Sequence, residues 1–325
     1  MKQTDASNPL TEEPFRTLVP LPAPLRRLEV GERLVFLGSC FAEHIGRAFR
    51  EACLPVVANP LGPLYAPASI VHTMDARRID DAAQAYGRWH TWLSDTTFSR
   101  PTREACLRDT QQALDGLQEA LAEADHLFLT LGTPRAYRLR QTGQVVANCH
   151  KHPQSEFEEI RPGVAGIVEG LDGALCRLRE RNPRAVVTFT VSPFRYAKYG
   201  FVESQRAKAR LLLAVEALQE RHPQWVQYFP AYELVMDELR DYRFYADDML
   251  HPSPQAVGYI ARRLQEWMTP ALRDYLRRWQ PLGQALAHRP LHPEGEAWEA
   301  FRQSTNRKLE HLQRDYPMLH IPDRL

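Results

Sequence analysis

The chain has 325 residues, enough for one large domain or for one domain with an appendage. Hydrophobic residues make up 44% and charged residues 25%, as in an ordinary globular protein with a sizeable core. The formal net charge of +1 gives no overall attraction to nucleic acid or to an anionic membrane, and we expect neither as a partner.

Two sequence features predict a cytoplasmic protein. The N-terminal residues, MKQTDASNPLTEEPF, lack the basic and apolar regions of a signal peptide, and no apolar run is long enough for a membrane-spanning helix. The five cysteines are scattered and include no CxxC pair. This spacing argues against a disulfide framework or a cysteine-zinc site and fits a reducing compartment.

Strand and helix signals alternate along the chain after an arm with several prolines over residues 1–30. Short apolar runs that end at turn residues predict buried strands at 33–38, at the start of 55–67, and at 126–132, 185–193 and 226–230. Apolar residues at helical spacing predict helices over 41–53, 103–124, 162–181, 203–221, 231–240 and 253–268. A turn at Thr142-Gly143 predicts a hairpin between AYRLR and QVVANC.

Strands that alternate with helices indicate right-handed crossovers and a parallel sheet. The strands are too few for an eight-fold barrel, so we predict a three-layer α/β/α sandwich. It is of the flavodoxin type, with a mostly parallel sheet of about five strands. We expect this domain over 31–269. Residues 270–325 form a charged C-terminal helical extension that either packs on the domain or mediates dimerisation.

The first strand ends at a serine and a cysteine that are both candidate nucleophiles. Ser39 would lie at a helix N-terminus, where free N–H groups and the helix dipole stabilise an oxyanion. The alternative is that Ser39 only caps the helix. Cys40 would be activated if it faced the cleft, but the apolar residues that follow favour a buried, structural thiol.

A general base for the serine is predicted in YADDMLHPSPQAVGYI, residues 245–260. His251 precedes a helix, and Asp248 lies three residues earlier, so its carboxylate can orient the imidazole. Asp247 is an alternative orienting residue. The alternative reading is an ordinary loop histidine near acidic residues. In a flavodoxin-like sheet, the last of these loops can lie beside the first strand.

Oxyanion donors are expected on the loops after the strands, because ligands of such sheets bind at the carboxyl ends of strands. The candidates are the N–H groups of Ser39 and Gly62 and the N–H or hydroxyl of Thr133. The Asn59 side chain is an alternative donor and a candidate substrate contact.

Several other polar residues are candidate substrate contacts. His90 lies between two tryptophans and lines either an acyl or sugar pocket or an aromatic core. Asn148 and His150 are the other candidates. His150 and His152 form a His-x-His pair, but no third ligand stands at a recognisable spacing, so we expect no metal. The absence of GxGxxG and GxxxxGK[ST] motifs predicts no nucleotide cofactor, and we expect no other cofactor.

Six ordered blocks resemble the GSCFA family: LGSCFAEHIG, NPLGPLYAPASI, LTLGTPRAYR, VVANCHKHP, FTVSPFRY, and YFPAYELVMDELRDYRFYADDMLHPSPQAVGYI. The resemblance covers residues 33 to 266. That family is grouped with the SGNH, or GDSL-like, hydrolases. The resemblance therefore implies a flavodoxin-like fold and serine-based acyl-ester chemistry.

When each block is matched to the corresponding block of the family, the resemblance implies that Ser39 is the nucleophile. It also implies that Asp248 and His251 form the terminal Asp-x-x-His motif. It implies that Gly62 is the oxyanion glycine of the second block. The wider superfamily has Gly-x-Asn in the third block, where this chain has Gly132-Thr133-Pro134. Thr133, Asn59 or Asn148 would replace that asparagine.

We therefore predict a serine-dependent acyl-ester hydrolase. Its substrate is a small molecule or a carbohydrate, and the resemblance implies an O-acetylated carbohydrate. Two alternatives remain open from the sequence. One is an acyltransferase that uses the same site, and the other is a non-catalytic carbohydrate-binding or interaction protein with a decayed site.

Overall fold

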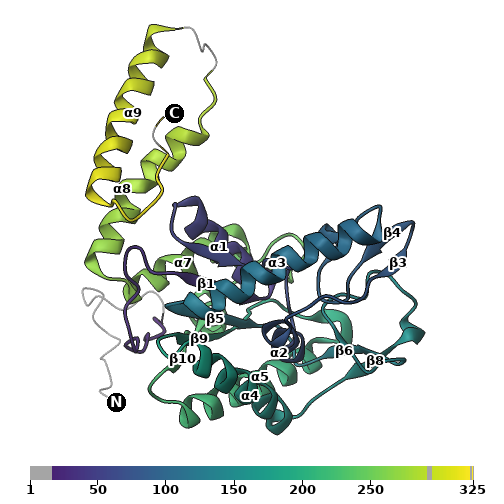
Figure 1. The fold of residues 1–325 in the computed structure, drawn as a ribbon. Coiled ribbons are helices and arrows are strands. Elements are labelled where there is room, and N and C mark those ends of the chain that lie inside the picture. The colour runs from purple at the N-terminus through teal and green to yellow at the C-terminus, as the bar shows by residue number, and fades with distance from the viewer. Residues whose placement is uncertain (1–16, 291–294, 323, 325) are drawn as a thin grey trace, which may run out of the picture.

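The computed structural model describes residues 17–290, 295–322 and 324. Its centre is a five-stranded sheet in the order β10-β9-β5-β1-β2, with every pair of neighbours parallel (Figure 1). The strands are β1 (Leu34–Gly38), β2 (Val56–Ala58), β5 (His126–Leu131), β9 (Val186–Val191) and β10 (Val226–Tyr228). Helices cover both faces, which confirms the predicted three-layer α/β/α sandwich.

Successive side chains of β1 point to opposite faces of the sheet, so the strand contributes to two separate halves of the hydrophobic core. The Phe36 ring packs on Phe128 at 4.6 Å between centroids, on the face covered by α1 and α7. Val35 and Leu37 belong to the core on the other face. The helices are α1 (Cys40–Glu51) and α7 (Pro254–Leu264) on the first face, and α2 (Pro67–Asp75), α3 (Arg103–Glu123), α4 (Val164–Arg181) and α5 (Phe201–Arg221) on the second.

The strand order creates a switch point between β1 and β5. The chain moves from β1 outward to β2 and then crosses back to β5 on the other side of β1. Gly38 at the end of β1 pairs with Thr130 of β5. Ligands of open α/β sheets bind at such a point, outside the carboxyl ends of the strands. The loops that follow β1 and β5 therefore flank the expected binding position.

Two small sheets lie outside the central one. The β3–β4 hairpin joins Ala83–Ala85 to Arg88–His90. The second sheet has the order β7-β6-β8 and consists of Val145–Val146, Ala136–Leu139 and Phe157–Ile160. Its β6–β7 pair confirms the hairpin that the turn at Thr142-Gly143 predicts. The strand β8 and the helix α2 were not among the predicted elements.

The predicted helix over 231–240 differs from the structure in its geometry. A short α6 (Ala231–Glu233) continues into the π-helix η4 (Leu234–Leu239), which ends at Arg240 in the left-handed region with φ 36°. The wider π turn keeps Leu234, Val235 and Leu239 buried. Short 3-10 segments complete the fold: η1 (Thr96–Phe98), η2 (Gln154–Glu156), η3 (Ala197–Tyr199), η5 (Tyr242–Phe244) and η6 (Gln265–Trp267).

A helical hairpin follows the sandwich and projects away from it (Figure 1). It consists of α8 (Pro270–Ala287) and α9 (Glu296–Asp315). The first half of α8 packs on the sandwich, and its Tyr275 hydroxyl donates to the Ala52 carbonyl at 2.6 Å. Within the described residues, no helix has the length and apolar character needed to cross a bilayer.

Part of the predicted N-terminal arm packs against the same core. Residues 1–16 lie outside the described residues, and the remainder runs to β1 without helix or strand. Leu28 is buried and forms a bridge with Met268, and the Trp267 indole donates to the Pro22 carbonyl at 2.8 Å. This segment thus covers the junction between η6 and α8.

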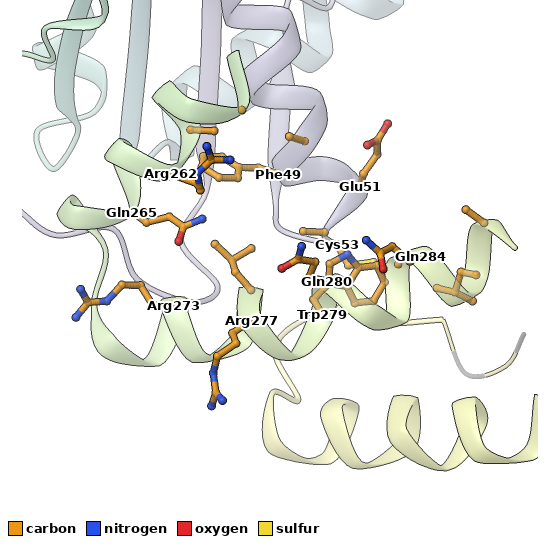
Figure 2. A pocket seen from close by; sticks show the side chains of 18 of the residues that line it. Phe49, Glu51, Cys53, Arg262, Gln265, Arg273, Arg277, Trp279, Gln280 and Gln284 are labelled. Carbon is orange, nitrogen blue, oxygen red and sulfur yellow. The ribbon is translucent and has the colours of Figure 1, made fainter. Parts of the chain in front are cut away.

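A wide pocket of about 1200 Å³ lies between the end of α1, α7 and α8 (Figure 2). Phe49, Arg262, Trp279 and Gln280 are among the side chains that line it. The pocket adjoins the C-terminal end of α1, whereas the turn after β1 lies at the N-terminal end of that helix. It is therefore separate from the candidate site described next.

Candidate active site

The turn from β1 to α1 presents Ser39 at the carboxyl edge of the sheet. Ser39 is the N-cap residue of α1, and its N–H donates to the Thr130 carbonyl at 3.1 Å. Gly38 has φ 131°, and a Cβ built there would lie 2.1 Å from the Thr130 oxygen. Only glycine fits this close approach of the two strands, so Gly38 determines how the serine is presented.

The Ser39 hydroxyl takes no part in capping α1. The residue is 1% exposed, and among the described residues no partner lies within hydrogen-bond distance of Oγ. The N–H groups of the first helical turn lie next to it, where the helix dipole favours negative charge. A buried hydroxyl that neither caps nor bonds remains available for chemistry.

Asn59 holds this turn from behind. Its amide Nδ2 donates to the Gly38 carbonyl at 2.9 Å, and its Oδ1 accepts the Gly38 N–H at 2.9 Å. The side chain is 6% exposed. Both ends of the amide are therefore occupied by the turn, and in this conformation neither faces a substrate.

The Gly62 and Thr133 backbone N–H groups also have protein partners in this conformation. The Gly62 N–H donates to the Asn59 carbonyl at 2.8 Å, and the Thr133 N–H donates to the Tyr65 carbonyl at 2.9 Å. The Thr133 hydroxyl accepts the Arg135 N–H at 3.3 Å. Among these candidate donors, only the hydroxyl proton of Thr133 is left without an acceptor within the described residues.

Asp248 and His251 form a hydrogen-bonded pair in the loop before α7. His251 Nδ1 lies 2.5 Å from Asp248 Oδ2, and Oδ1 accepts the N–H groups of Leu250 and His251, each at 2.9 Å. These bonds, led by the His251 N–H, lower the pKa of Asp248 to about 2. The ionised carboxylate favours the tautomer with the proton on Nδ1, which leaves Nε2 free to accept one.

The loop after β9 packs against His251. The Phe194 ring packs against the imidazole with centroids 4.4 Å apart, and the Arg195 N–H donates to the Leu250 carbonyl at 3.0 Å. The pKa of His44 in α1 is lowered by burial first and then by Arg47 and His251, so His44 and His251 interact. Ser39 Oγ makes no hydrogen bond to His251 in this conformation.

Cys40 has the character of a protonated thiol. Burial raises its pKa above the ordinary value, and nearby Lys208 offsets only part of that effect. Because the thiolate is the reactive form of cysteine, this environment disfavours Cys40 as a nucleophile.

Lys208 is a polar residue of the site that the sequence analysis missed. It is 3% exposed, and its Nζ donates to the carbonyls of Gly132 and Ser192 at 2.7 and 2.6 Å. It therefore joins the loops that follow β5 and β9. A signal was present in the sequence, because Lys208 shares the apolar stripe of its helix with Leu211 and Val215.

The candidate contacts His90, Asn148 and His150 form a second cluster. The His90 and His150 rings stack at 4.0 Å, and Asn148 Oδ1 accepts the His150 N–H at 2.7 Å. Burial, followed by His150 and His152, lowers the pKa of His90 to about 3, so this imidazole is neutral. These side chains order the loop that carries Asp95.

Asp95 connects this cluster to the serine turn. The Asp95 N–H donates to the Leu61 carbonyl at 2.9 Å. Its side chain packs so closely on Gly62 that a Cβ added to this glycine would lie only 2.4 Å from the Asp95 Cγ. Hydrogen bonds connect Asn59 to the Ser39 turn and to Gly62, and Thr133 follows β5, the strand whose Thr130 pairs with Gly38.

Comparison with known proteins identifies a family. The model described as the GSCFA family matches residues 33–264, and the model described as GSCFA domain protein, C-terminal domain, matches residues 279–323. No curated protein matches the chain.

Two solved structures are similar to the chain at low identity. An acetyl xylan esterase from the rumen bacterium Butyrivibrio proteoclasticus is 13% identical, with a TM-score of 0.34 over 79% of this chain and 66% of that one. A serine-to-alanine variant of an acetyl esterase with acetate ion is 13% identical, with a TM-score of 0.31 over 76% and 98% of the two chains. TM-scores this low do not support any inference about function from these two structures.

Proposed function

Since the chain belongs to the GSCFA family, we propose that it is a serine-dependent acyl-ester hydrolase. Ser39 is the nucleophile, His251 the general base, and Asp248 the residue that orients His251. The observation that carries the proposal is the Asp248–His251 pair, whose 2.5 Å hydrogen bond and ionised carboxylate leave Nε2 as a proton acceptor. The same pairing orients the base in serine hydrolases on unrelated folds.

The reaction follows from these roles. His251 Nε2 takes the hydroxyl proton while Ser39 Oγ bonds to the ester carbonyl carbon, and the carbonyl oxygen becomes an oxyanion. The N-terminus of α1 and the Thr133 hydroxyl stabilise that negative charge. The imidazolium then protonates the departing alcohol and leaves an acyl-serine. Water, deprotonated by His251, releases the acid and restores the serine.

The buried Ser39 hydroxyl requires a small opening movement in this scheme. The N–H groups of Gly132 and Thr133 both donate to the Tyr65 carbonyl at 2.9 Å, which joins the loop after β5 to the loop that includes Tyr65. His251 is about half-exposed, with 49% of its side chain accessible, so its ring has room to turn toward the serine. Catalytic hydrogen bonds are often absent without substrate and form in the complex.

The substrate proposed is an O-acetylated carbohydrate, and this part rests on the family analogy. A small acyl group suits a site in which Ser39 lies beneath closely packed loops. A long acyl chain would need an apolar channel beside the serine.

Hydrolysis of p-nitrophenyl acetate tests the serine assignment. We expect Ser39→Ala to lower kcat/KM by about 10³-fold or more, because it removes the nucleophile. The matched control is Cys40→Ser, which replaces the adjacent candidate nucleophile and should retain activity. Unchanged turnover in Ser39→Ala, or a comparable loss in Cys40→Ser alone, would contradict the proposal.

A further inference from the structure

A cluster of three potential metal ligands lies where α4 meets the end of α5. Asp172 and Cys176 belong to α4, and His222 is the C-cap residue of α5. One ligand atom from each residue lies within 4.8 Å of the other two. We propose that these three side chains bind a zinc ion that links the two helices.

The backbone of both helices holds the ligands in place. Asp172 and Cys176 are four residues apart and therefore lie on one face of α4. The His222 N–H donates to the Leu218 carbonyl at 3.0 Å, and its own carbonyl accepts the N–H groups of Trp225 and Val226. Its ring packs beside Trp225 with centroids 4.8 Å apart. A ligand set that is already ordered loses little entropy on binding an ion.

A second layer of contacts orients the aspartate. Arg221 donates to Asp172 Oδ2 at 2.9 Å, while Oδ1 lies 2.5 Å from His222 Nε2. Oδ1 and Nε2 are thus already neighbours, and a zinc ion would replace their hydrogen bond as the two atoms separate to about 3.3 Å. Hydrogen bonds that hold a ligating carboxylate in this way are a regular feature of metal sites.

The donor set determines which metal fits. One sulfur, one nitrogen and one carboxylate oxygen would be three of the four ligands of a tetrahedral zinc ion, with water as the fourth, whereas magnesium and calcium require oxygen ligands. Binding releases the Cys176 thiol proton, and the His222 proton moves from Nε2 to Nδ1. A thiolate and a carboxylate then balance the double positive charge. Cys176 is exposed, so an ion can enter from solvent.

The place in the fold favours a structural role. His222 precedes β10, at the amino ends of the strands, whereas Ser39 follows the carboxyl end of β1. The α4 and α5 helices lie side by side on one face of the sheet (Figure 1). The sequence does not indicate this site, because its ligands come from two helices and form no spaced motif.

Cobalt titration of the full chain under reducing conditions tests the proposal. Co²⁺ should produce the near-ultraviolet charge-transfer band of a cobalt–thiolate bond, and Zn²⁺ should abolish it. Cys176→Ser should remove the band, and His222→Gln should weaken Co²⁺ binding at least about tenfold. The matched control Cys53→Ser removes another partly exposed thiol and should leave the band unchanged.

Thermal unfolding supplies an independent readout. Zinc should raise the unfolding temperature of the wild type and of Cys53→Ser but not of Cys176→Ser or His222→Gln. A band that persists in Cys176→Ser, or zinc stabilisation equal in all four proteins, would overturn the proposal. Absence of any band in the folded wild type would overturn it as well.

Discussion

At the scale of single residues, the side chains of the proposed triad lie in different environments. Ser39 Oγ is buried without a partner, an arrangement that costs about 1–3 kcal/mol for a hydroxyl. Asp248 is exposed, yet its carboxylate is held by two N–H groups and an imidazole. The structure thus leaves the Ser39 hydroxyl without a partner among the described residues and holds the Asp248 carboxylate firmly beside His251.

The first prediction concerns the orienting carboxylate. Asp248→Asn keeps the shape of the side chain but turns it into a donor toward His251 Nδ1, so the proton is favoured on Nε2 instead. We expect kcat for p-nitrophenyl acetate to fall by about 10³- to 10⁴-fold. Asp247→Asn is the matched control, because the bond to His251 comes from Asp248. Equal losses in the two variants would argue against the assigned pair.

Lys208 provides a prediction with a defined pH dependence. Burial lowers the pKa of Lys208 from 10.5 to about 7, so the folded state releases this proton near pH 7. The unfolded chain keeps it until about pH 10. Between these pH values the unfolded state binds more protons than the folded state. The contribution of Lys208 to the free energy of unfolding therefore rises with pH.

The unfolding temperature of the wild type minus that of Lys208→Met should therefore increase from pH 7 to pH 10. Subtracting the variant removes the contribution of other titrating groups. A flat difference would show that the folded amine titrates at its ordinary value, and a falling one would show a raised pKa; either result would contradict the lowered pKa.

At the scale of elements, the strand-to-helix turn is the part that the sequence predicts best. RLVFLG ends at a glycine, and both the buried strand and the following helix appear close to their predicted bounds. The reason is local: a short apolar run and helical periodicity are visible in the sequence itself.

Other features could not be predicted, because distant contacts determine them. The π geometry of η4 depends on which of its residues become buried, and β8 is a strand because it pairs with β6. The partners of Lys208 come from the loops after β5 and β9. Residue type and spacing indicate Ser39, Asp248 and His251 as candidate catalytic residues. They do not indicate whether Ser39 and His251 are hydrogen-bonded.

Gly38 allows a direct test of this turn. Gly38→Ala places a methyl group against the Thr130 carbonyl at a positive φ, and we expect it to lower the free energy of unfolding by about 2–4 kcal/mol. Gly116→Ala is the control, because a Cβ there has no neighbour within 4 Å in α3, and it should stabilise by roughly 0.5–1 kcal/mol. Urea unfolding measures both. A neutral Gly38→Ala would contradict the close approach.

At the scale of the whole molecule, the C-terminal hairpin and the sandwich share one core. Leu272 and Tyr275 of α8 belong to the same buried cluster as Phe36 and Ile45. Leu312 of α9 extends that cluster along the hairpin. The wide pocket at this junction (Figure 2) therefore lies where two parts of one core diverge.

The hydroxyl of Tyr275 tests that connection. Tyr275→Phe removes its hydrogen bond to the Ala52 carbonyl and leaves that carbonyl without the donor, which should cost about 1–2 kcal/mol. Tyr86→Phe is the control, because Tyr86 is 81% exposed and should change stability little. Chemical denaturation compares the two. Equal stability of both variants would show that α8 does not depend on this anchor.

Labelling with a fluorophosphonate reagent tests whether Ser39 forms the covalent acyl intermediate. Ser39 and Cys40 share the tryptic peptide of residues 34–47, so fragmentation must localise the adduct within it. We expect an adduct on Ser39 that is absent in Ser39→Ala and forms more slowly in His251→Ala. An adduct on Cys40 or on another residue, or an active enzyme that resists labelling, would contradict it.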